Sequence, residues 1–87
     1  MTRRALPHHP GALIREYLAA KEMTQADLAR HSGLTPKHIS RIVTGQSGVG
    51  THAAVAIAHA LRIDAGVLMR AQADWDLAHM RTRNTSR

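Results

Sequence analysis

Two cationic side chains, Lys37 and Arg41, stand four residues apart in the segment TPKHISRIVTG. Residues four apart on a helix share a face, so both cations would reach the same ligand. Each can donate hydrogen bonds to O6 and N7 of guanine, and an arginine can do so with two parallel bonds. The plainer alternative is that both contact phosphates or are solvated.

Smaller polar residues surround this pair. Thr35 and Ser40 can bond to a base or a phosphate, whereas Pro36 suits the first position of a helix and can touch a thymine methyl group. Further side chains suited to phosphate oxygens are Gln25, His38 and Thr44. Gln25 would stand at a helix start, where unpaired N–H groups favour an anion.

The elements that must position these side chains lie within residues 24–45, where we expect two helices joined by a tight turn. Thr24 can cap the first helix together with Asp27, in a near relative of the capping box. Gly33 stands at the turn, where a positive φ is favoured. Thr35 can cap the second helix, and Gly45 favours its end.

Apolar residues fall where these two helices must pack. Leu28, Leu34, Ile39 and Ile42 supply the contacts, and Ala29 is small where the helices must approach closely. This pattern is typical of a helix-turn-helix unit. In such a unit the second helix enters the DNA major groove and the first crosses the phosphate backbone.

The segment resembles the helix-turn-helix of the Cro/phage-repressor type, the XRE family. The residues that carry the resemblance fit one spaced pattern: Gln25, Leu28, Ala29, Gly33, Leu34, Ile39, Ile42 and Gly45. A closer likeness, to the HigA/VapI antitoxins, extends over residues 8–78. It includes His9-Pro10-Gly11, Arg15-Glu16, His38-Ile39-Ser40 and QADWDL at 72–77.

The resemblance implies a lambda-repressor-like fold in which positions 36, 37, 40 and 41 read bases. It implies an antitoxin of a type II toxin–antitoxin pair that represses its own operon and neutralises a ribonuclease-type toxin from the adjacent gene. One departure is the loop at Gln46 and Ser47, where the family often has basic residues. We therefore expect weaker nonspecific affinity for DNA.

Helical periodicity outside the motif predicts three more helices and no strand, at about residues 10–21, 51–61 and 65–79. Thr51 is expected to cap the second of these, and Asp64 the third. With helices at about 25–32 and 36–44, the fold is predicted to be an all-α five-helix bundle. We expect a flexible arm at 1–8, the DNA-binding domain at 9–80 and a disordered basic tail at 81–87.

Composition narrows the function further. Twelve Lys and Arg against six Asp and Glu give the 87 residues a formal charge of +6, which attracts nucleic acid. No cysteine is present, which excludes disulfides and thiolate metal sites. Neither a membrane span nor a signal segment is evident, so a cytoplasmic location is expected.

Enzymatic and metal-dependent functions have little support. The seven histidines include no pair with the i, i+4 spacing and nearby acid of a helical zinc site. The serines lack the setting of a nucleophile. We expect no catalytic residue, no metal and no cofactor.

The last predicted helix carries more apolar residues than one small core needs: Leu68, Trp75, Leu77 and Met80. One helix-turn-helix reads half of a palindromic operator, so these residues are candidates for a homodimer interface. Trp75 in the monomer core is an equal alternative. A free-standing phage- or plasmid-type repressor, and a toxin-binding module with weak DNA affinity, also remain open.

Overall fold

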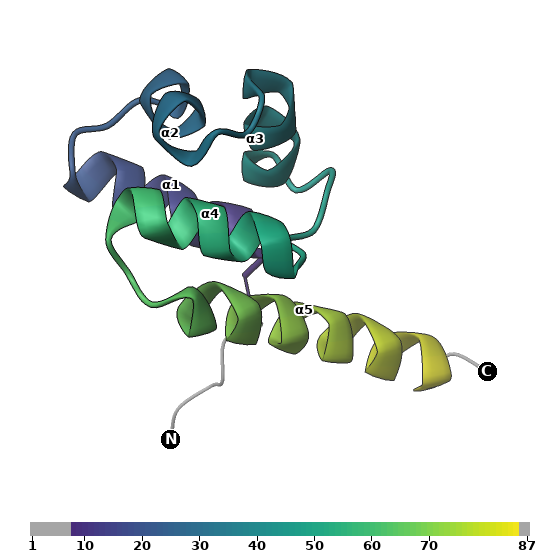
Figure 1. The fold of residues 1–87 in the computed structure, drawn as a ribbon. Helices are drawn as coiled ribbons and strands as arrows, with labels where there is room; N and C mark the ends of the chain where they lie inside the picture. Colours follow the sequence, from purple (N-terminus) through teal and green to yellow (C-terminus); the bar gives the residue numbers. More distant parts are fainter. Residues whose placement is uncertain (1–7, 86–87) are drawn as a thin grey trace.

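Five helices and no strand make up the backbone that the structure, a computed structural model, describes at residues 8–85; side chains are described for residues 8–80. The helices are α1 (Pro10–Ala20), α2 (Gln25–Ser32), α3 (Pro36–Val43), α4 (Thr51–Leu61) and α5 (Ala65–Thr85). In Figure 1, α2 and α3 lie at one end of the molecule and α5 at the other. The predicted all-α, five-helix architecture is confirmed.

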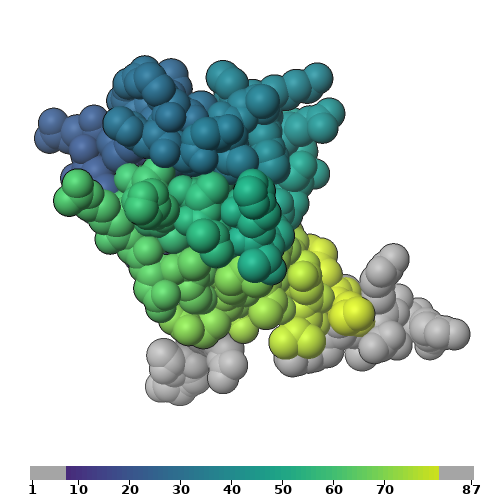
Figure 2. All heavy atoms as spheres, viewed as in Figure 1, coloured from purple at the N-terminus to yellow at the C-terminus, as the bar shows by residue number. Residues whose placement is uncertain are grey.

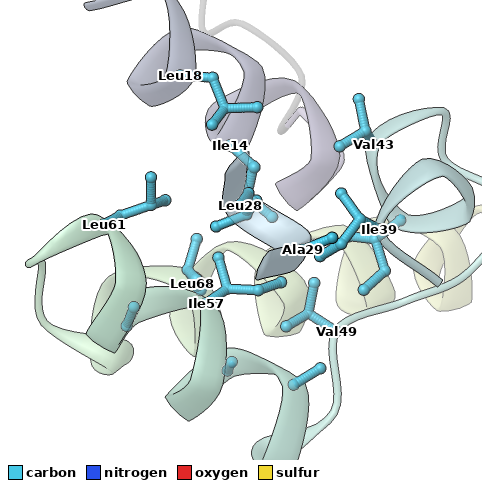
Figure 3. Packing of buried hydrophobic residues seen from close by; sticks show 14 residues of the cluster. Ile14, Leu18, Leu28, Ala29, Ile39, Val43, Val49, Ile57, Leu61 and Leu68 are labelled. Atoms are coloured by element: carbon cyan, nitrogen blue, oxygen red, sulfur yellow. The ribbon is translucent and has the colours of Figure 1, made fainter. Parts of the chain in front are cut away.

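A single core joins all five helices. Each helix contributes at least one side chain that is at most 1% exposed: Ile14, Leu28, Ile39, Ile57 and Leu68. Figure 3 shows these side chains converging between the helices. Burial of aliphatic side chains is the main favourable term in folding, so this cluster fixes how α2 and α3 sit on the rest of the chain.

The helix-turn-helix is built by the local interactions that its sequence predicts. The Thr24 hydroxyl accepts the Asp27 N–H at 3.0 Å, and the Asp27 carboxylate accepts the Thr24 N–H at 3.0 Å, which completes a capping box. Thr35 caps α3 by accepting the His38 N–H at 3.1 Å. Gly33 has a φ of 79°, the left-handed conformation that a glycine adopts without strain.

The start of α4 differs from the expectation. Thr51 is the first residue of α4 and Gly50 is its N-cap, with no side-chain hydrogen bond. The helix starts without a side-chain cap because its buried face, including Ala54 and Ile57, already holds it on the core. Asp64, by contrast, accepts the Gly66 N–H at 3.2 Å at the start of α5, as predicted.

Helix α5 is longer than predicted. We expected it to end near residue 79 and residues 81–87 to be disordered, yet the backbone is helical to Thr85. The sequence has no proline or glycine after Gly66 to end the helix. Most of the expected arm, residues 1–7, and residues 86–87 lie outside the described residues. No described helix is long and apolar enough to cross a membrane.

Candidate nucleic-acid interface

Helix α3 has one buried and one exposed face. Ile39 and Ile42 are at most 1% exposed, so the residues between and before them turn away from the core. The exposed side chains are those of Thr35, Pro36, Lys37, Ser40 and Arg41. All five predicted base-reading residues therefore lie on the outer surface of α3 and its cap. Figure 2 shows α2 and α3 together forming one end of the molecule.

Lys37 and Arg41 are available for a ligand. Among residues 8–80, the ion pair that the structure shows joins Arg30 to Asp27 at 2.6 Å, and no hydrogen bond engages the Lys37 or Arg41 side chain. Both are exposed and one helical turn apart. An arginine in this position can form paired bonds to guanine or phosphate, whereas a lysine acts as a point charge.

The hydroxyl groups near α3 differ in what they can still donate. Thr35 accepts a hydrogen bond from His38 N–H, so its own proton remains available for a base or phosphate. Thr44 instead donates its proton to the carbonyl oxygens of Ser40 at 2.9 Å and Arg41 at 3.3 Å. A phosphate only accepts, so the predicted Thr44 contact requires this internal bond to break.

The start of α2 is the second part of the candidate interface. Gln25 is exposed at the first position of the helix, where backbone N–H groups and the helix dipole favour an anion. Asp27 adds a negative charge nearby. Its hydrogen bond from the Thr24 backbone, followed by those of the Thr24 and Arg30 side chains, lowers the pKa of that carboxyl group. The Arg30 guanidinium at 2.6 Å offsets this charge.

One exposed residue was not among the predicted contacts, and another is less accessible than expected. Thr24 was predicted only as a cap, yet its side chain is also exposed beside Gln25 at the start of α2. Its position next to Gln25 in the sequence was the available signal. His38, predicted to contact phosphate, is half-buried on α3.

Comparisons with known proteins agree with this geometry. The model of the helix-turn-helix family HTH_3 matches residues 14–68, more than half of the chain. The chain belongs to this family. No curated protein sequence matches it significantly. The helix-turn-helix family consists of DNA-binding regulators and not of enzymes, so this chain is a DNA-binding helix-turn-helix regulator.

Three solved structures share the helix-turn-helix fold. A protein described as an antidote of a plasmid maintenance system from Nostoc punctiforme has a TM-score of 0.87 and 22% identity, over 94% of this chain and 90% of that one. The antitoxin HigA from Pseudomonas aeruginosa, solved with the higBA promoter, has a TM-score of 0.84 and 27% identity, over 92% and 88%. The restriction-modification controller C.AhdI from Aeromonas hydrophila has a TM-score of 0.64 and 32% identity, over 68% and 89%. The resemblance to HigA-type antitoxins of the XRE family is thus confirmed.

The structure divides the four predicted interface residues on α5. Leu68 is fully buried, so its assignment to a dimer interface was wrong: α5 packs on α4 at this point and Leu68 completes the monomer core. Leu77 and Met80 are 54% and 57% exposed. Trp75 is half-buried and packs edge-on against the ring of His9.

Within the described part of the chain, no group of three or more His, Cys, Asp or Glu residues is arranged to hold a metal ion. Two of the seven histidines precede α1, and the others lie on α2, α3, α4 and α5, with His52 and His59 both on α4. His31 and His59 line one shallow hollow beside Arg62, with no acidic residue among its lining.

Proposed function

We propose that this protein is a homodimeric, sequence-specific repressor that binds a palindromic operator and serves as the antitoxin of a type II toxin–antitoxin pair. The observation that carries the DNA-binding part is the exposed face of α3, where Lys37 and Arg41 stand one turn apart without internal partners among the described residues. The base-reading residues proposed are Thr35, Pro36, Lys37, Ser40 and Arg41. The proposed phosphate contacts are Gln25, His38 and Thr44, and we add Thr24.

The division of labour follows from the position of each element. Residues at the start of α3 approach the base edges, because the core holds its opposite side through Ile39 and Ile42. The start of α2 contacts the phosphate backbone and fixes the register of α3 on the duplex. Two copies related by a two-fold axis would read half-sites about 34 Å apart, or a multiple of it.

A gel shift with the DNA upstream of the protein's own gene tests this function. We expect saturable binding that is much tighter than to a scrambled duplex of equal length. Titration with salt should give a linear fall of log K with log salt concentration, with a slope of about −0.9 for each phosphate neutralised. Equal affinity for both duplexes refutes sequence-specific repression and leaves a toxin-binding module with weak DNA affinity.

The antitoxin role is supported by the likeness to HigA, which is 27% identical over 92% of this chain. We propose that the partner is a ribonuclease-type toxin encoded beside this gene, and that the protein acts in the cytoplasm on the DNA of the nucleoid. Co-expression with the adjacent gene should yield a stable complex and relieve toxicity.

A free-standing regulator is the second candidate. This chain is 32% identical to a restriction-modification controller protein, so its similarity is not limited to antitoxins, and this favours the second candidate. The two candidates predict the same operator binding but different neighbours. A toxin gene next to this one supports the antitoxin, and its absence supports the free-standing regulator.

A further inference from the structure

His9 lies where three parts of the molecule meet. It is the N-cap of α1, and its Nδ1 accepts the Gly11 N–H at 2.9 Å. Its ring packs edge-on against Trp75 of α5, with 5.2 Å between the ring centroids. A Cβ atom placed on Gly45, just after α3, would lie 4.0 Å from Cγ of His9. We call these four residues, His9, Gly11, Gly45 and Trp75, the His9 junction.

The same region fixes the last turn of α3 against α1. A Cβ atom on Gly11 would lie 2.1 Å from the carbonyl oxygen of Ile42 and 2.9 Å from that of Val43. The first turn of α1 is therefore packed directly on the backbone of α3. A shift of this turn must move the C-terminal end of α3 or open a gap beneath it.

Helix α5 also holds the loop that follows α3. The Gln72 side chain accepts the Val49 N–H at 2.7 Å and donates to the Asp76 carboxylate at 2.9 Å. Val49 is itself 2% exposed. The far end of α3 is thus packed on α1 at the His9 junction, and the loop that follows α3 is held on α5 by Gln72.

We propose that His9 is a positioning residue for DNA recognition, whose neutral ring holds the end of α3 in place and whose protonation releases it and weakens operator binding. The proposal rests on the proposed function, since it concerns the helix that reads the operator. His9 itself need not touch DNA.

The chemistry of the N-cap explains why protonation of His9 weakens the junction. Nδ1 can accept the Gly11 N–H only without a proton, so the ring proton of neutral His9 is on Nε2. A second proton removes the acceptor and places a positive charge at the positive end of the helix dipole. The charged groups that face His9 are Asp76 and His79 of α5, of which Asp76 favours protonation and His79 opposes it.

Burial is the largest cause that lowers the pKa of His9 below 6.5; the Asp76 charge raises it in part and His79 lowers it further. The unfolded chain therefore binds this proton more tightly than the folded chain does. The stabilisation of the fold by neutral His9 is complete above pH 6.5 and is lost as the pH falls through the pKa of His9 in the folded chain.

Substitution of His9 by asparagine isolates the effect, since asparagine is a good N-cap that does not titrate. The binding of a duplex from upstream of the gene is measured at pH 7.5 and pH 5.5 for the wild type and His9→Asn. Between pH 7.5 and pH 5.5 we expect the wild type to lose roughly fivefold more affinity for this duplex than His9→Asn does. A factor of five corresponds to about 1 kcal/mol, the typical contribution of an N-cap. His52→Asn, exposed on α4, is the matched control and should keep the loss.

Trp75 gives a second readout that needs no DNA, because it is the only tryptophan. Its fluorescence should change below pH 6.5 in the wild type and His52→Asn, and this change should vanish in His9→Asn. His79 also contacts Trp75, with ring centroids 4.1 Å apart, so His79→Asn is tested in parallel.

Three results separate the outcomes. The proposal is overturned if the ratio of the wild-type affinity to the His9→Asn affinity is the same at both pH values. A fluorescence change that survives in His9→Asn but is lost in His79→Asn also overturns it, by assigning the titration to His79. Absence of specific binding by every variant at pH 7.5 refutes the proposed function and the coupling to DNA with it, while the fluorescence still decides whether protonation of His9 alters the junction.

Discussion

At the scale of single residues, Lys37 and Arg41 share a face of α3 but offer different recognition. The planar guanidinium of Arg41 can form two parallel bonds to guanine, whereas the Lys37 ammonium is a flexible point charge. Removal of Arg41 should therefore change which sequence is bound, and not only how tightly. The loss of Lys37 should act more evenly across sequences.

We predict that Arg41→Ala weakens operator binding by about 1–3 kcal/mol and relaxes discrimination at one base pair. The measurement is a set of binding titrations against the operator and its single-base variants. Arg41→Lys keeps the charge and should lose discrimination at the same base pair, because the paired bonds are lost.

Arg70→Ala is the matched control, since Arg70 is an exposed arginine on α5, at the end of the molecule opposite α2 and α3 (Figure 1). It removes the same charge without touching the candidate interface. If Arg41→Ala weakens all duplexes equally, Arg41 contacts phosphate and base reading must be assigned elsewhere on α3.

At the scale of elements, the features that the sequence predicts are those made within a few residues. The capping box of Thr24 and Asp27, the turn at Gly33 and the cap at Thr35 involve neighbours in the chain, so their residue types suffice. Exposure on α3 follows from the spacing of Ile39 and Ile42. The residues of the candidate DNA interface could therefore be predicted from the sequence.

Contacts between segments that are distant in the sequence could not be predicted in this way. Periodicity places Leu68 on an apolar face of α5, but it does not indicate whether that face meets α4 or a second copy. His9 is 66 residues away from Trp75 in sequence, and nothing local indicates their ring contact. The hydrogen bond from Val49 to Gln72 is missed for the same reason.

Gly11 provides a test of how α1 and α3 pack. We predict that Gly11→Ala destabilises the protein by about 1–3 kcal/mol, the usual cost of overpacking, because its Cβ would lie 2.1 Å from the Ile42 carbonyl oxygen. Backbone atoms cannot rotate away as a side chain would. Urea denaturation followed by circular dichroism measures the change.

Gly50→Ser is the matched control for a side chain added at a glycine. A Cβ atom at Gly50 meets nothing within 4 Å, and this residue is the N-cap of α4 without a side-chain bond. Serine there should stabilise the protein by a few tenths of a kcal/mol. If Gly11→Ala is as well tolerated as Gly50→Ser, the contact between α1 and α3 is looser than the structure shows.

At the scale of the whole molecule, the candidate DNA surface and the exposed apolar residues of α5 lie apart. The C-terminal half of α5 runs past α4 on the side of the molecule where α3 lies (Figure 1). We propose that two copies join through this half of α5, so that each presents its α3 to one half-site of the operator.

Leu77 and Met80 are the exposed apolar residues of this half, and we predict that replacing both with serine breaks the dimer. Each is a little over half exposed and should contribute about 1 kcal/mol by burial. The four side chains of a dimer then amount to roughly a thousandfold in its dissociation constant, measured by sedimentation equilibrium. Val55→Ser is the control, because Val55 on α4 is equally exposed at 54%. A wild-type chain that stays monomeric contradicts the proposed dimer, and a double variant that stays dimeric with unchanged helicity places the dimer interface on a different surface.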